Sequence, residues 1–178
     1  MSDEQDLDAV LIGGPERVEI RVVDYDPSWP ARFDELAARV RTALGAAALR
    51  VEHIGSTAVP GLAAKPIIDV LVVVEDVTDE ARFVPPLEAA GFELRVREPG
   101  HRMLRTPGRT AHLHFFEPDD EAIPAYLDLR ARLRTDPTDR ELYAATKREL
   151  AKRPWDDMNA YAEPKSEVIA AILARARA

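Results

Sequence analysis

Three polar side chains interrupt two apolar segments of this sequence in a pattern that predicts a metal site. Asp69 is the single charged residue in the β-branched run 67–74, and burying a carboxylate is costly unless it binds something. His112 and His114 alternate along a second apolar stretch, so on a strand both imidazoles would point the same way. A carboxylate on a central strand can hold a divalent cation against phosphate oxygens. We therefore take Asp69, His112 and His114 as candidate catalytic and metal-binding residues.

His53 lies just before a glycine–serine turn and is a fourth candidate ligand, which could face the same cleft. Imidazole ligands would shift the preferred ion from Mg²⁺ towards Mn²⁺, Zn²⁺ or another transition ion. Each histidine also has a plain structural interpretation, in the core or on the surface. Asp69 could instead cap a helix or pair with Lys65.

The loop Gly55-Ser56-Thr57 predicts a phosphate-binding turn. It follows a short β-leaning segment, residues 50–54, and precedes the strand that carries Asp69. Its small residues let the backbone come close to a ligand, and if the loop feeds a helix, free N–H groups would favour an anion. Lys65, further along the same loop, could neutralise phosphate charge. The alternatives are a tight turn of small residues and a solvated lysine.

The C-terminal third offers two further candidate phosphate ligands, Arg130 and Lys147. Arg130 would share a helix face with Arg134, and Lys147 with Tyr143, because each pair is four residues apart. Such side chains could grip phosphates or a carboxylate. Surface charge on amphipathic helices is the alternative interpretation.

Hydrophobic periodicity predicts a mixture of strands and helices up to residue 118 and helices alone after it. The expected strands are residues 18–23, 50–54, 67–74, 92–96 and a hairpin of 102–106 with 110–116. The expected helices are residues 29–45, 79–90 (limited by Pro85-Pro86), 123–134, 139–152 and 158–176, the last broken at Pro164.

Composition indicates a single globular domain. With 178 residues the chain can bury a proper core, and without cysteine it has neither disulfides nor a thiolate zinc site. No run approaches a membrane span and the acidic N-terminus does not resemble a signal peptide, so a cytoplasmic location is expected. A net charge of -8 argues against general nucleic-acid binding, although a local basic patch stays open.

We expect residues 1–17 to form a disordered acidic arm and residues 18–178 to form one domain. Within that domain, residues 18–118 would be a sheet-containing core and residues 119–178 a helical part. An exposed edge strand and amphipathic C-terminal helices would permit a homodimer without requiring one.

The stretch 52–69 resembles the GrpB family, also called UPF0157, which is placed in the nucleotidyltransferase superfamily. The likeness extends over residues 25–30, 112–114 and 129–134, then Tyr143, Lys147, Tyr161 and Lys165. It implies an α+β fold, with a nucleotidyltransferase-like mixed β-sheet, helices packed on one side and a helical C-terminal portion. The same domain is found fused to dephospho-CoA kinase in some bacteria.

The resemblance also implies roles for individual residues. Gly55 and Ser56 would hold nucleotide phosphates, and Asp69 matches the first metal-binding aspartate. The superfamily usually has a second acid where this chain has Leu71. The third acid comes from a later strand, which here offers His112 and His114. Ala131 replaces an aspartate that family members generally show.

Two functions follow from these residues, with a third kept open. The chain would transfer a nucleoside monophosphate from an NTP to a small acceptor, using Mg²⁺, Mn²⁺ or Zn²⁺. Alternatively, it would bind a nucleotide or a coenzyme-A-like metabolite without chemistry, because the carboxylate set is incomplete. Histidine ligands could instead support a metal-dependent phosphoesterase. Each interpretation takes a small phosphorylated molecule as the partner.

Overall fold

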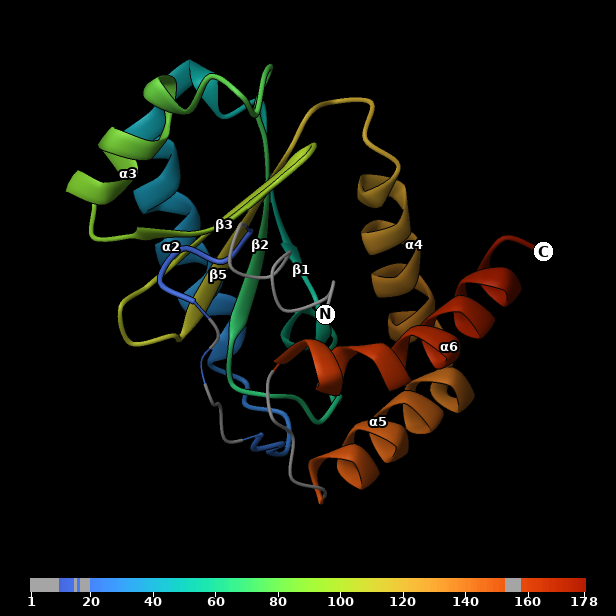
Figure 1. Ribbon diagram of the computed structural model, residues 1–178. Coiled ribbons are helices and arrows are strands. Elements are labelled where there is room, and N and C mark those ends of the chain that lie inside the picture. The colour runs from blue at the N-terminus through green and yellow to red at the C-terminus, as the bar shows by residue number, and fades with distance from the viewer. Residues whose placement is uncertain (1–9, 15, 17–19, 153–157) are drawn as a thin grey trace, which may run out of the picture.

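A mixed β-sheet of five strands forms the centre of the protein (Figure 1). The computed structural model describes residues 10–14, 16, 20–152 and 158–178. The strands are β1 (Arg50–Ile54), β2 (Ile68–Val73), β3 (Glu93–Glu98), β4 (His101–Arg105) and β5 (Ala111–Phe116). Their order across the sheet is β1-β2-β5-β4-β3. The central strands β2 and β5 are parallel, and all other neighbours are antiparallel.

Helices lie on both sides of this sheet. They are α2 (Trp29–Leu44), α3 (Val84–Ala89), α4 (Ala122–Thr135), α5 (Pro137–Ala151) and α6 (Met158–Ala176). Figure 1 shows α2 and α3 on one side, with the three C-terminal helices on the other. The expected α+β class, with a mixed sheet and a helical C-terminal portion, is therefore confirmed. Among the described residues, no helix has the length and apolarity that crossing a bilayer requires.

The main core lies between the sheet and α2 with α3. Helix α2 starts with Pro30 in its first turn, where a missing N–H costs nothing. Its buried residues Leu36, Val40 and Leu44 recur every four positions and so form one apolar face. That face packs on the β2 residues Val70 and Val72. The sequence pattern predicted this helix correctly.

A second apolar cluster fills part of the opposite sheet face, beneath α4. It joins Ile54, Leu71, Val73 and Phe116 of the sheet to Ile123 of α4. Leu71 is fully buried there. The position at which the superfamily carries its second acid is therefore part of a hydrophobic contact.

The C-terminal helices form a third cluster against the loop between β1 and β2. Val59 and Leu62 of that loop pack with Leu133, Tyr143 and Ile172 from α4, α5 and α6. The helices are also joined by ion pairs around the buried Asp139, to which Arg132 and Arg175 donate hydrogen bonds. This packing brings lysines of α5 and α6 to the loop.

Three expected elements differ from the structure. Of the expected strand 18–23, the described residues 20–23 form one isolated bridge, between Val23 and Ala64. The expected helix 79–90 is regular only over α3, because Pro85 and Pro86 suit its first turn, and Glu80–Arg82 form a separate 3₁₀ turn. Helix α6 continues through residue 164 without the expected break.

The expected loose arm, residues 1–17, lies mainly outside the described residues. The part that is described contacts the edge of the sheet. Leu11 forms a bridge with Val96, and Arg95 donates hydrogen bonds to the carbonyl oxygens of Ile12 and Gly14. Glu16 accepts a hydrogen bond of 2.8 Å from Arg105. These residues therefore extend the ordered structure beyond β3.

Candidate metal and phosphate site

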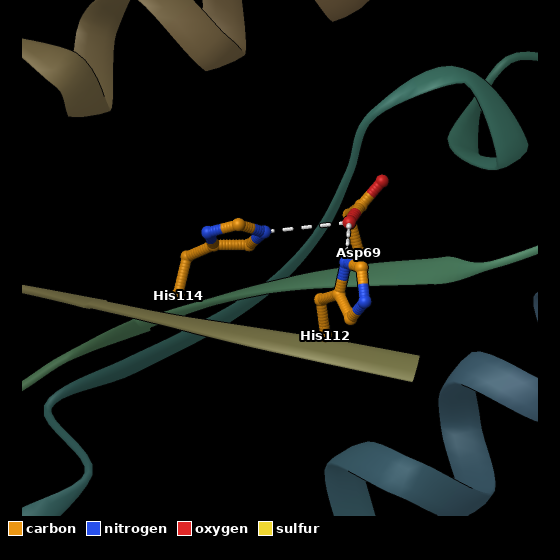
Figure 2. Close-up of side chains that lie close together, drawn as sticks. All are labelled: Asp69, His112 and His114. Carbon is orange, nitrogen blue, oxygen red and sulfur yellow. Dashed lines mark hydrogen bonds and ion pairs between the residues drawn. The ribbon is translucent and has the colours of Figure 1, made fainter. Parts of the chain in front are cut away.

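Asp69, His112 and His114 meet on one face of the sheet (Figure 2). The parallel pairing of β2 and β5 places Asp69 beside His112, and His114 follows two positions later on the same face. Asp69 Oδ1 lies 3.3 Å from His114 Nε2 and 3.6 Å from His112 Nδ1. The sequence prediction that these three side chains converge agrees with this geometry.

The donor set fits a divalent ion. Ligand atoms about 2.1 Å from a tetrahedral ion lie roughly 3.4 Å from one another. The two distances from Asp69 Oδ1, 3.3 and 3.6 Å, lie close to that value, and all three candidate ligand atoms lie within 4.8 Å of one another. Three protein ligands leave a further position open for water or substrate, as in catalytic sites. One carboxylate and two imidazoles suit Mn²⁺ or Zn²⁺ better than Mg²⁺.

The electrostatics of Asp69 agree with a cation-binding role. Burial raises the pKa of the Asp69 carboxyl, but hydrogen bonds and charge from His112 and His114 outweigh it and hold the pKa well below its usual range. The side chain is still 30% exposed, so the carboxylate can be reached from the cavity. It is therefore ionised at neutral pH and able to bind a cation.

His53 is not brought to this cluster. In the antiparallel pairing of β1 with β2, His53 lies opposite Val70, whereas Ile54 lies opposite Asp69. His53 therefore points to the other face, where its ring stacks on Phe33 at 4.7 Å between centroids. Burial lowers the pKa of His53 to about 4, so it is a neutral core residue at pH 7.

The loop after β1 passes close to the Asp69 carboxylate. Gly55 has φ of +72°, and a Cβ built on it would lie 2.6 Å from Asp69 Oδ2. A glycine is required here for both reasons. The loop then makes only a short 3₁₀ turn, Ser56–Ala58, so no long helix supplies an anion-binding dipole. Positive charge for phosphate must come from side chains.

Three lysines supply that charge. Lys65 from the loop, Lys147 from α5 and Lys165 from α6 line one cavity of about 360 Å³, together with Asp69 and the two site histidines. This volume is within the range for small-molecule sites. Lys147 Nζ donates to the Ser56 hydroxyl at 2.8 Å and to the carbonyl oxygen of Ala63 at 2.5 Å. The cavity wall therefore combines candidate metal ligands with cationic side chains.

The lysines lower one another's affinity for protons. Burial lowers the pKa of Lys147 to about 7, and the charges of Lys165 and Arg148 add to this effect. Burial and Lys165 similarly lower the pKa of Lys65 to about 8. Burial also lowers the pKa of Lys165. An anion in the cavity would reverse these shifts by stabilising the charged amines.

Two other predicted ligands have structural contacts as well as a place in the cavity wall. Thr57 is 1% exposed, and its Oγ1 bonds to His53 Nε2 and the carbonyl oxygen of Ile67. Arg130 donates hydrogen bonds to Glu52 and to the carbonyl oxygen of His53. Thr57 therefore fixes the loop, and Arg130 anchors α4 to β1.

Sequence reasoning assigned no role to four side chains at or beside the site. Lys165 and Tyr126 line the cavity, and burial raises the pKa of Tyr126 to about 12. His101 and Glu98 lie behind His114. One signal was available for His101, because extending the predicted strand 102–106 by one residue would have put position 101 on the face of Met103 and Arg105, the partners of His114 and His112.

Comparison with known proteins agrees with this architecture. The fold is that of the nucleotidyltransferases. The structure is similar to a MgGTP-bound crystal structure of the Cid1 poly(U) polymerase, with a TM-score of 0.52 and 18% sequence identity. The aligned region covers 74% of this chain and 45% of the polymerase chain. At that identity the likeness shows the fold alone.

The family is shown by closer matches. A sequence profile described as GrpB protein matches residues 19–175. A UPF0157 protein of Streptomyces coelicolor is 53% identical over 168 residues, which are 94% of this chain and 90% of that protein. The crystal structure of GrpB from Enterococcus faecalis covers 88% of this chain and 96% of its own, with 36% identity and a TM-score of 0.78. The chain belongs to the GrpB family, as its central motif predicted.

Proposed function

We propose that this protein transfers a nucleoside monophosphate from an NTP to a small acceptor with the help of a divalent ion. One observation supports the proposal: a cluster of three candidate metal ligands and three lysines line a single cavity, in a protein with the nucleotidyltransferase fold. The similar Cid1 structure has MgGTP bound. Mn²⁺ or Zn²⁺ suits the donor set here.

In this proposal, different residues of the cavity bind the metal ion, bind the phosphates and stabilise the leaving group. Asp69, His112 and His114 hold the ion, which when bound supplies Lewis-acid stabilisation of triphosphate charge. Lys147 and the Ser56 hydroxyl, joined at 2.8 Å, offer two neighbouring donors to phosphate oxygens. In the reaction an acceptor oxygen bonds to the α-phosphorus, the α–β anhydride bond breaks, pyrophosphate leaves and the acceptor proton passes to water. Lys65 and Lys165 balance the charge of the departing pyrophosphate.

The test uses tag-free protein with each α-labelled NTP, pooled small acceptors and Mg²⁺, Mn²⁺ or Zn²⁺. We expect metal-dependent release of pyrophosphate and transfer of label to an acceptor, both abolished by EDTA. Saturable NTP binding with no pyrophosphate under any ion would contradict transfer. Release of inorganic phosphate from simple phosphoesters, without NTP turnover, would point to a phosphoesterase instead.

One observation favours a second candidate, a non-catalytic binding module. Leu71 occupies the place of the second acid and is fully buried against Ile123 and Phe116. A module of this kind would bind a nucleotide or a coenzyme-A-like metabolite through the lysines. Its distinguishing result is metabolite binding that EDTA and the loss of Asp69 leave unchanged.

Replacing Lys147 by methionine is expected to weaken NTP binding by about 10- to 100-fold, because charge-assisted hydrogen bonds contribute about 1.5–3 kcal/mol.

The affinity of the wild-type protein for NTP should also fall as the pH rises from 7 to 9. A bound anion stabilises the protonated lysines, and Lys147 and Lys65, with pKa values of about 7 and 8, lose protons over this interval. NTP phosphates are already ionised there, above a second pKa of about 6.

Calorimetric titration in EDTA at constant ionic strength measures both effects without a metal contribution. Lys152→Met is the matched control, since this lysine follows α5 and its side chain is 68% exposed. Affinity that rises between pH 7 and 9, or that is equal in wild type and Lys147→Met, would contradict the proposed phosphate site.

A further inference from the structure

His114 belongs to a row of hydrogen-bonding side chains that begins outside the cavity. Glu98 Oε2, at the end of β3, lies 2.8 Å from His101 Nδ1. His101 Nε2 lies 3.2 Å from His114 Nδ1, and His114 Nε2 lies 3.3 Å from Asp69 Oδ1. The β3–β4 hairpin is thus connected, through two imidazoles, to the candidate metal site.

When a cation occupies the site, Asp69 and His114 Nε2 both direct lone pairs to it in place of their own hydrogen bond, and the carboxylate at the outer end sets the direction of the remaining hydrogen bonds. An ionised Glu98 can only accept, so His101 Nδ1 carries the proton that it donates. In a neutral His101 the other nitrogen, Nε2, is then an acceptor. It accepts from Nδ1–H of His114, which leaves a lone pair on His114 Nε2. That nitrogen is the one that faces Asp69.

Packing holds the two rings in place. The His101 ring stacks on Phe116, with centroids 4.8 Å apart and planes 16° from parallel. The His101 and His114 rings are within 10° of parallel, with centroids 5.5 Å apart. Both side chains are mostly buried, at 18% and 17% exposed. The neighbours of His101 therefore fix its orientation as well as its tautomer.

We propose that Glu98 and His101 are positioning residues that fix His114 with the Nε2 lone pair towards a bound metal ion. The inference rests on the metal site of the proposed function and deepens it. A hydrogen bond to the far nitrogen of a ligating histidine sets its tautomer and increases its basicity as a ligand. Here a second imidazole carries that influence from a carboxylate on the neighbouring hairpin.

The test is Zn²⁺ affinity without nucleotide, measured by competition with a chromophoric chelator at fixed pH. Removing a hydrogen-bond partner of a metal-ligating histidine typically lowers metal affinity by 10- to 100-fold. We expect a decrease of this size in Glu98→Gln and in His101→Phe. The phenylalanine in His101→Phe keeps the ring stacked on Phe116. His101→Gln should stay within about threefold of wild type, because its amide oxygen can accept from His114 while its NH₂ donates to Glu98.

Glu93→Gln is the matched control, because Glu93 and Glu98 are both on β3 and both 45% exposed, but Glu93 pairs with Arg105. It should bind Zn²⁺ as wild type does. The proposal would be overturned if Glu98→Gln or folded His101→Phe bound Zn²⁺ as tightly as the wild type. Weak Zn²⁺ binding by His101→Gln, or no Zn²⁺ binding by the wild type, would also overturn it. If Zn²⁺ binds as expected but no NTP is turned over, the proposed function fails and this inference stands.

Discussion

Asp69→Asn is expected to abolish divalent-ion binding and to reduce any nucleotidyl transfer by at least about 10³-fold. The carboxylate is the single anionic member of the cluster and lies within 3.6 Å of both imidazole ligands. An asparagine has nearly the same shape but carries no charge, so the change removes metal affinity without opening a cavity. Transition-state stabilisation that depends on the ion is lost with it.

Metal titration and pyrophosphate release together measure this effect. The control is Asp128→Asn, which removes an acid from an exposed ion pair between α4 and Arg177, outside the residues that line the cavity. It should behave as wild type in both measurements. Full transfer activity in Asp69→Asn would rule out the proposed metal-dependent reaction.

Gly55→Ala is expected to combine a loss of stability with a loss of metal affinity. The φ of +72° at Gly55 strains any residue with a Cβ, by about 1 kcal/mol or more. In addition, the new methyl group would lie 2.6 Å from Asp69 Oδ2. The Asp69 carboxylate must therefore shift from its present position beside His112 and His114, and we expect Zn²⁺ affinity to fall at least tenfold.

Gly61→Ala separates the two causes. Gly61 has a similar φ of +78°, but a Cβ there would meet nothing within 4 Å. It should lose about 1 kcal/mol in urea unfolding and keep wild-type Zn²⁺ affinity. Equal stability and equal Zn²⁺ affinity of the two alanine variants would contradict the idea that the loop holds Asp69 in position.

Local sequence patterns predicted the three candidate metal ligands because each lies in a short segment with a clear pattern. A period of two puts His112 and His114 on one strand face, and Asp69 is conspicuous in an apolar run. The parallel pairing that aligns Asp69 with His112 is a long-range contact. No local pattern encodes this pairing, and only the resemblance to a known family implied that the later strand would contribute to the same site.

His53 shows the limit of this reasoning. Successive strand residues face opposite sides of a sheet, so a shift of one residue moves a side chain from the site to the core. The register that places Ile54, and not His53, opposite Asp69 comes from the turn and from the packing of both faces. Sequence alone placed His53 near the cleft without deciding its face.

The cationic side chains of the cavity were predicted only in part from sequence. Lys65 and Lys147 were candidate phosphate ligands, with solvated side chains as the alternative, whereas Lys165 was given no role; the three come from segments up to 100 residues apart. Only the packing of α5 and α6 on the loop brings them together. Glu98 and His101 were missed for a similar reason, since their importance depends on the partner at His114.

Leu71 explains why the candidate metal site has one carboxylate and two imidazoles in place of a second carboxylate. Because this position packs against α4, a second carboxylate would have to be buried among apolar side chains, which is unfavourable. The imidazole of His114 lies beside it on β5 and offers a neutral ligand instead. A cluster with one acid and two histidines follows from the packing and suits a transition ion.

The most direct test of the central claim is anomalous scattering from crystals grown with Mn²⁺ and a non-hydrolysable NTP. The account predicts a Mn²⁺ peak between Asp69 Oδ1, His112 Nδ1 and His114 Nε2, with the triphosphate extending from it towards Lys147 and Ser56. A nucleotide bound elsewhere, or bound in this cavity with no ion at the three side chains, would contradict it.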